Sequence, residues 1–118
     1  MNELENLLIY KTHLDLIYYT EYIIKKYPKS EREALCVSTR MTVYEIMKKI
    51  ILSFKELNKS KRVLILNELD VDLKMLKVYV RIAYKNKYIS ASNYGAWSRK
   101  ITGVNNLLFG WIKICLKQ

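Results

Sequence analysis

The chain has 118 residues, of which 51% are hydrophobic, with one proline and three glycines. This length fits one domain, residues 1–118, and the hydrophobic content excludes a disordered chain. So few turn-forming residues disfavour a sheet protein. We therefore predict an all-α antiparallel up-down four-helix bundle, with helices over about 3–27, 31–57, 61–87 and 91–117.

The formal net charge of +10 is distributed unevenly along the chain. Residues 1–72 carry twelve Lys or Arg and eleven Asp or Glu, whereas residues 73–118 carry nine basic residues and no acidic one. Positive charge gathered in this way attracts polyanions such as RNA, DNA, an acidic protein face or an anionic membrane surface. Charge that serves solubility alone usually intersperses the two signs, as residues 1–72 do.

The first predicted helix, over about 3–27, carries two neighbouring apolar stripes, and Tyr19 and Ile23 belong to the second. Together the stripes are wider than one contact within the chain requires, which indicates an oligomer interface, although tyrosines also tolerate a wet surface. Glu21 interrupts the first stripe and is expected to pair with an arginine such as Arg40. His13, the only histidine, lacks a catalytic partner in register and indicates a surface or hydrogen-bonded residue.

The second helix is predicted to start after Pro28, because the residue before a proline disfavours the α conformation. Ser30 and Glu33 match a capping box, which places the helix over about 31–57. Its apolar stripe runs to Leu57 and includes Arg40. Two interpretations of Arg40 stay open: its stem packs while its head reaches solvent, or its guanidinium is partly buried and pairs with a carboxylate from another helix or lines a functional groove.

The third helix, over about 61–87, carries an apolar seam at helical spacing, with a line of cations beside it. The seam comprises Leu66, Leu69, Leu73, Leu76, Val80 and Ala83. The cations are Lys74, Lys77, Arg81 and Lys85. Their spacing of three and four places them on one face, where like charges repel each other unless an anion compensates.

The fourth helix, over about 91–117, is expected to be capped by Ser90 or Ser92. Its seam includes Trp97 and Trp111, and it also holds all three glycines, each costing about 1 kcal/mol relative to alanine. The glycines indicate either tight helix packing or the approach of a subunit or ligand. Gly103 and Gly110 share a line with Lys100, where small residues would let a phosphate come close.

A second polar line of this helix contains Arg99, Asn106 and Lys113, which are seven residues apart. We predict a nucleic-acid-binding surface that contacts the phosphate backbone with weak sequence preference. Its candidate residues are Lys74, Lys77, Arg81, Lys85, Arg99, Lys100, Asn106 and Lys113. The candidates for oligomer or core packing are Tyr19, Ile23, Trp97, Gly103, Gly110 and Trp111.

The sequence lacks the patterns of a phosphate loop, a nucleophile elbow, paired histidines or a zinc site. We therefore expect no enzyme, no catalytic residue, no metal and no cofactor. Cys36 and Cys115 fall on apolar stripes, as small buried residues of a reducing compartment do. The acidic N-terminus does not resemble a secretion signal, and no apolar run approaches the ~20 residues that span a bilayer. The expected location is cytoplasmic, without a membrane partner.

Several segments, in their order and spacing, resemble the accessory variability determinant (Avd) proteins of diversity-generating retroelements. These are similar to the four-helix proteins encoded in bacterial 23S rRNA intervening sequences. The resemblance covers nearly the whole chain. It rests on the junction at 26–32, Arg40, the run at 73–83, Trp97 and the segment 108–112.

This resemblance implies a bundle that assembles as a homopentameric barrel. It also implies binding of RNA or DNA and of the retroelement's reverse transcriptase, in support of mutagenic cDNA synthesis without catalysis by the protein itself. Lys74, Lys77 and Arg81 would carry the nucleic-acid role. Where typical Avd sequences have Gly-Arg, this chain has Asn105-Asn106. An intervening-sequence protein, or a basic protein-interaction module that binds no nucleic acid, therefore stays an alternative.

Overall fold

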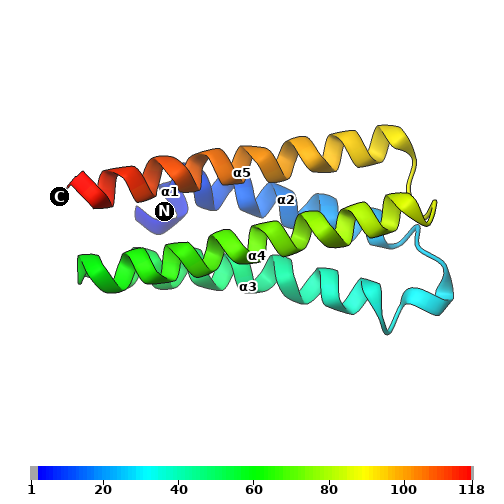
Figure 1. The fold of residues 1–118 in the computed structure, drawn as a ribbon, viewed down its shortest axis with the longest axis horizontal. Helices are drawn as coiled ribbons and strands as arrows, with labels where there is room; N and C mark the ends of the chain where they lie inside the picture. Colours follow the sequence, from blue (N-terminus) through cyan, green and yellow to red (C-terminus); the bar gives the residue numbers. More distant parts are fainter. Residues whose placement is uncertain (1–2, 118) are drawn as a thin grey trace.

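The computed structural model describes residues 3–117, and these form four long α-helices and two short helical segments. The long helices are α2 (Leu8–Ile24), α3 (Leu35–Lys55), α4 (Lys59–Lys85) and α5 (Ala91–Lys117). The short segments are α1 (Glu3–Asn6) and the 3-10 turn η1 (Lys29–Glu31). The long helices alternate in direction (Figure 1). The prediction of an all-α fold with four long helices is confirmed.

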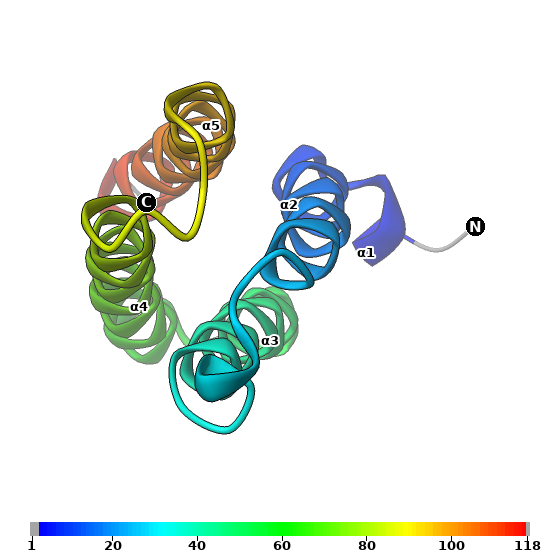
Figure 2. The same ribbon diagram turned by 90° about the vertical axis from the view of Figure 1, so that its right-hand side faces the viewer.

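Each long helix packs against two others and forms one side of an elongated bundle. In the end-on view of Figure 2 the order around the bundle is α2, α3, α4, α5, and the closest pairing is between α3 and α4. The molecule measures 46 × 27 × 24 Å along its principal axes. Neighbours in sequence are therefore neighbours in space, and α5 closes the bundle by packing on α2.

The core seams of α4 and α5 lie where the apolar spacing predicts them. All six predicted seam residues of α4, from Leu66 to Ala83, are at most 1% exposed. On α5, Trp97, Ile101, Val104 and Leu108 are fully buried. Burying large apolar side chains is the main favourable contribution to folding, so these two helices anchor the core.

The seams of α2 and α3 contain polar side chains that hydrophobic spacing does not detect. His13, Thr20, Thr39 and Ser53 are fully buried at seam positions. Thr20 shows how one of them is accommodated, because its hydroxyl accepts the indole N–H of Trp97 at 3.1 Å and donates to the Leu16 carbonyl at 2.8 Å. The predicted stripes of these two helices were therefore incomplete.

The predicted bounds of the first two helices are wrong. The helix expected over 3–27 is interrupted at Leu7, whose backbone is extended, and α2 ends at Ile24. The helix expected over 31–57 starts at Leu35, since Ser30 lies in η1 and caps nothing. Residues 29–34 bury no side chain against the core, so packing offers little to offset the cost of starting a helix there. Leu57 follows the end of α3 and is 89% exposed.

The turn from α4 to α5 is tightly held and sets how the two helices face each other. Lys87 adopts a left-handed backbone, with φ of 64°, and the Tyr88 N–H donates back to the Ala83 carbonyl at 2.9 Å. Ser90 then caps α5, because its hydroxyl oxygen accepts the backbone N–H of Asn93 at 3.0 Å. The expected cap at Ser90 or Ser92 is thus at Ser90.

Candidate nucleic-acid interface

A groove between α4 and α5 holds the clearest cationic site of the molecule. Lys77 and Arg81 of α4 and Tyr94, Ser98 and Thr102 of α5 line a surface pocket of about 400 Å³. Lys77 and Arg81 each follow a buried seam residue by one position, so helical geometry places them at the edge of the core that faces α5. We call this the α4–α5 groove.

The charge of Lys77 and Arg81 is not neutralised by the protein. Within residues 3–117 neither side chain forms an ion pair, and both residues are exposed. Across the groove, Ser98 and Thr102 are one helical turn apart on α5 and add hydroxyl donors. An ammonium, a guanidinium and two hydroxyls together match the several acceptor oxygens of a phosphate group.

Two tyrosine rings stack across the groove near the α4–α5 turn. The ring centroids of Tyr84 and Tyr94 are 4.3 Å apart and their planes differ by 12°. Tyr84 is 40% exposed, so part of an aromatic surface stays open beside the cations. Aromatic rings of this kind can stack on nucleic-acid bases.

The four predicted cations of α4 differ in whether an acidic side chain pairs with them. Lys74 donates to the carboxylate of Asp70 at 2.6 Å, one turn earlier on the same helix. The expectation that this line of cations lacks a compensating acid is therefore wrong at Lys74. The expectation arose because the acid-free segment begins at residue 73, although a helix brings residues four apart together. Lys85 is exposed in the last turn of α4, where the helix dipole favours a cation.

The predicted cations of α5 lie outside the groove. Lys100 faces α2, where it pairs with Asp15 at 2.8 Å and lies 5.3 Å from the centroid of the Tyr19 ring. Arg99 borders the same side, in a shallow pocket that also contains Asp15 and Lys100. Asn106 and Lys113 are exposed farther along the helix. The eight candidates therefore do not form one surface.

The candidates for packing divide into core and surface residues. Ile23 and Trp97 are fully buried within the chain. Tyr19 is half-buried against Trp97, with ring centroids 6.4 Å apart. Trp111 is half-buried and lines an apolar surface pocket together with the exposed side chains of Leu8 and Ile114. The last of these regions leaves apolar surface open to another molecule, as does the region of Tyr19, whose neighbour Tyr22 is 54% exposed.

The glycines of α5 do not mark tight packing inside the chain. A Cβ added at Gly103 would lie 3.9 Å from the nearest atom, a methyl group of Thr12, which is ordinary contact. A Cβ added at Gly110 would have no neighbour within 4 Å. The interpretation of these two glycines as sites of close approach between helices of one chain is therefore wrong. Approach of another molecule stays a prediction.

The site residues predicted from the sequence do not include the residues of α5 that line the groove. Tyr94, Ser98 and Thr102 recur at steps of four, on the side of α5 that faces α4. That spacing could have identified them once α4 and α5 were placed side by side. Ser98 and Thr102 are uncharged, however, so a search for cations passes over them.

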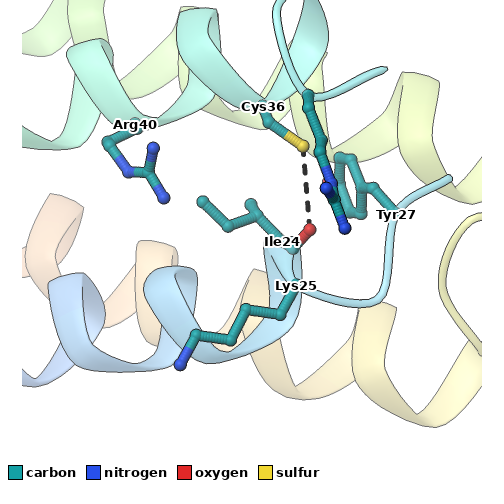
Figure 3. A pocket seen from close by; sticks show the side chains of 6 residues that line it. Ile24, Lys25, Tyr27, Cys36 and Arg40 are labelled. Atoms are coloured by element: carbon teal, nitrogen blue, oxygen red, sulfur yellow. Dashed lines mark hydrogen bonds between the residues drawn. The ribbon is translucent and has the colours of Figure 1, made fainter. Parts of the chain in front are cut away.

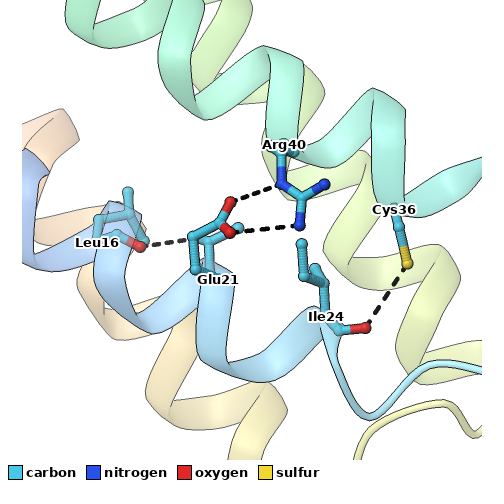
Figure 4. Close-up of polar contacts among 6 residues, drawn as sticks. Leu16, Glu21, Ile24, Cys36 and Arg40 are labelled. Carbon is cyan, nitrogen blue, oxygen red and sulfur yellow. Dashed lines mark hydrogen bonds and ion pairs between the residues drawn. The ribbon is translucent and has the colours of Figure 1, made fainter. Parts of the chain in front are cut away.

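The alternative left open at Arg40 is settled by an ion pair between α2 and α3. Arg40 donates to the two carboxylate oxygens of Glu21 from Nε at 2.8 Å and from a terminal nitrogen at 3.3 Å (Figure 4). The hydrogen bond to Glu21 raises the pKa of the Arg40 guanidinium. The pairing with a carboxylate of another helix is confirmed, but the guanidinium is not buried: the Arg40 side chain is 45% exposed, as the interpretation with the head at solvent expects.

Two further findings bear on chemistry and location. Among the described residues, no group of three or more His, Cys, Asp or Glu side chains could hold a metal ion. Over the same part of the chain, no helix combines the length and apolar character needed to cross a membrane.

The helical arrangement and the α4–α5 groove together define a basic helical-bundle protein with a phosphate-compatible surface. Comparison with protein families then identifies the group. A family model described as bAvd-like matches residues 7–115, so the chain belongs to the bAvd-like family, and the resemblance to Avd proteins is confirmed. A search of curated proteins gives no match.

Proposed function

We propose that this protein is a non-catalytic nucleic-acid-binding accessory protein of a diversity-generating retroelement. In this role it binds the reverse transcriptase and the template RNA or its cDNA, and it supports mutagenic reverse transcription. Membership of the bAvd-like family supports the general class. The observation that carries the nucleic-acid part is the uncompensated pair Lys77 and Arg81 opposite two hydroxyls in the α4–α5 groove.

A phosphate chain lying in the groove would exchange its counterions for Lys77 and Arg81. Release of those counterions favours binding and requires no particular base sequence. Ser98 and Thr102 would donate to phosphate oxygens, and Tyr84, which is 40% exposed, would offer a surface on which a base can stack. Binding of this kind is strong at low salt and weakens steeply as salt rises.

The buried position of His13 supports a role without catalysis. His13 is fully buried, and its Nε2–H donates to the Val43 carbonyl at 2.7 Å. A general base must come within hydrogen-bond reach of a substrate proton, which a side chain enclosed by the core cannot do. The one residue type that titrates near neutral pH without perturbation is thus committed to the interior.

Reversal of two charges tests the proposal. The double variant K77E/R81E is expected to reduce RNA binding at least a hundredfold in an electrophoretic shift assay, since two attractive contacts become repulsive. Wild-type affinity should also fall with salt by roughly 0.7 log units per log unit for each contact to a single strand. Circular dichroism should show an unchanged fold, because both side chains are exposed and form no ion pair within residues 3–117.

The matched control is the double variant K11E/K48E. It makes the same change in net charge at two exposed lysines of α2 and α3 that lie away from the groove. The control should lose far less affinity than K77E/R81E. Equal losses in the two variants would mean that net charge, not the groove, governs binding. No shift by RNA or DNA with the wild type would favour a protein-interaction module.

A further inference from the structure

A second basic pocket lies where α2 turns into α3, away from the α4–α5 groove. It has a volume of about 330 Å³, and Figure 3 shows its walls, which come from the end of α2, the connecting segment and the start of α3. Its lining residues are Ile24, Lys25, Tyr27, Arg32, Cys36 and Arg40. We call it the junction pocket. The proposed nucleic-acid role makes no use of it.

Positive charge exceeds negative charge around the junction pocket. Glu21 holds Arg40, but Lys25 and Arg32 form no ion pair with any residue of the described range 3–117. Arg40 and Arg32 both act to lower the pKa of the Cys36 thiol, while Glu31 acts to raise it, so all three charges lie within electrostatic reach of that sulfur. Burial is the larger effect, and it raises this pKa. After Glu21 and Glu31 are counted, the three cations leave a positive excess.

The pocket wall also contains a hydroxyl without a partner. Tyr27 is 6% exposed, and its hydroxyl oxygen is buried without a hydrogen bond to the residues that the structure describes. Burial, and next the neighbouring Cys36, raise the pKa of the Tyr27 phenol, which therefore keeps its proton as a donor. A buried donor without an acceptor destabilises the fold. A ligand with acceptor oxygens would remove that cost.

We propose that the junction pocket binds a phosphate group. The lining includes two arginines, a lysine and Tyr27, whose hydroxyl is enclosed, whereas the Cys36 thiol already lies 3.7 Å from its acceptor, the Ile24 carbonyl. A phosphate monoester carries about two negative charges and three terminal oxygens, more acceptors than a carboxylate has. Arginine binds such oxygens in pairs, so Arg32 and the free edge of Arg40 suit them. The group is either free phosphate or the terminal phosphate of a nucleic acid.

Calorimetric titration of the full-length protein with inorganic phosphate at constant ionic strength tests the site. The wild type should show saturable binding. R32Q should bind at least tenfold more weakly, and Y27F several-fold more weakly. K48Q, which removes an exposed cation of α3 outside the pocket, should match the wild type. R32Q should keep its fold, because Arg32 is exposed and forms no hydrogen bond or ion pair from its side chain within residues 3–117.

Three results would overturn the proposal: absence of saturable phosphate binding, wild-type affinity in R32Q, or equal losses in R32Q and K48Q. A second titration compares a dinucleotide carrying a 5′-phosphate with the same dinucleotide carrying a 5′-hydroxyl. If the wild type prefers the dinucleotide with the 5′-phosphate and R32Q abolishes this preference, the site binds nucleic-acid ends. If the wild type binds inorganic phosphate but shows no such preference, the site binds free phosphate. The α4–α5 groove also offers donors for phosphate, so the junction pocket is identified by the loss of affinity in R32Q relative to K48Q, two variants that leave Lys77 and Arg81 unchanged.

Discussion

His13 is a fully buried polar residue of the core. Its Nε2–H donates to the Val43 carbonyl at 2.7 Å, which fixes the tautomer and leaves Nδ1 buried without a partner among the described residues. Burial lowers the pKa of His13 from 6.5 to about 4, because the charged imidazolium is poorly solvated in the core and the hydrogen bond to Val43 only partly offsets this. The folded protein therefore contains neutral His13 at neutral pH.

Acid should destabilise the protein through His13. The unfolded chain binds this proton below pH 6.5, whereas the folded chain binds it only below about pH 4. The stabilising contribution of neutral His13 is complete above pH 6.5. It is lost between pH 6.5 and 4, which lowers the free energy of unfolding by about 3 kcal/mol. Urea denaturation of wild type and H13L across this pH range measures the effect. The difference in free energy of unfolding between wild type and H13L should shrink or reverse toward pH 4. A difference that does not depend on pH would contradict the prediction.

Gly110 should be replaceable by alanine with a gain in stability. The position is helical and exposed, and a Cβ there meets no atom within 4 Å. G110A should raise the free energy of unfolding by roughly 0.5–1 kcal/mol, because alanine loses less backbone freedom on folding. G103A is the matched variant with one ordinary contact. Both are measured by urea denaturation, and a loss of stability in G110A alone would show that another molecule occupies this face.

At the scale of elements, the two serines that match helix caps behave differently. The Ser90 hydroxyl accepts the Asn93 N–H at 3.0 Å and donates to the Asn93 side-chain oxygen at 2.9 Å. S90A should lower the free energy of unfolding by about 1 kcal/mol. S30A should change it little, since Ser30 is exposed in η1 and caps no helix. Thermal unfolding compares the two variants, and equal shifts in Tm would contradict this assignment of caps.

The same comparison shows how far local sequence signals predict elements. The number, order and direction of the long helices follow from apolar spacing and from the scarcity of glycine and proline. The start of α3 does not, because Ser30 and Glu33 satisfy a capping pattern in a segment that buries nothing. A cap pattern predicts a helix start only where the next turn also packs: residues 93–96, after Ser90, are partly buried, whereas residues 32–34, after Ser30, are exposed.

The charged residues of the candidate site could be predicted from the sequence, whereas its uncharged residues could not. Lys77 and Arg81 follow from the one-residue offset to the α4 seam. Whether a cation is paired depends on its neighbours in space, so the pairing of Lys100 with Asp15, which are 85 residues apart, could not be read from the sequence. The buried His13 and Thr20 escaped detection for a related reason, since a polar residue at a seam position is recognised only when its buried partner is known.

At the scale of the whole molecule, the assembly predicted from the resemblance gives a measurable mass. Leu8 is 62% exposed and Ile114 is 59% exposed, and both border the apolar pocket that contains Trp111. Apolar surface of this kind is typical of contact sites. Light scattering is expected to give a multiple of the 14.1 kDa subunit, five copies if the resemblance extends to assembly. L8E/I114E should dissociate it, and a monomeric wild type would contradict the prediction.

The stack of Tyr84 on Tyr94 affects how the α4–α5 groove responds to ionic strength. The rings join the two walls of the groove through an apolar contact, and the walls are anchored by the uncharged seams of α4 and α5. Dissolved ions weaken the attraction between cations and phosphate, but they hardly affect contacts of this type. A change in ionic strength should thus alter the occupancy of the α4–α5 groove by nucleic acid while leaving the width of the groove unchanged. The empty protein would then be a preformed template, ready for a strand without rearrangement.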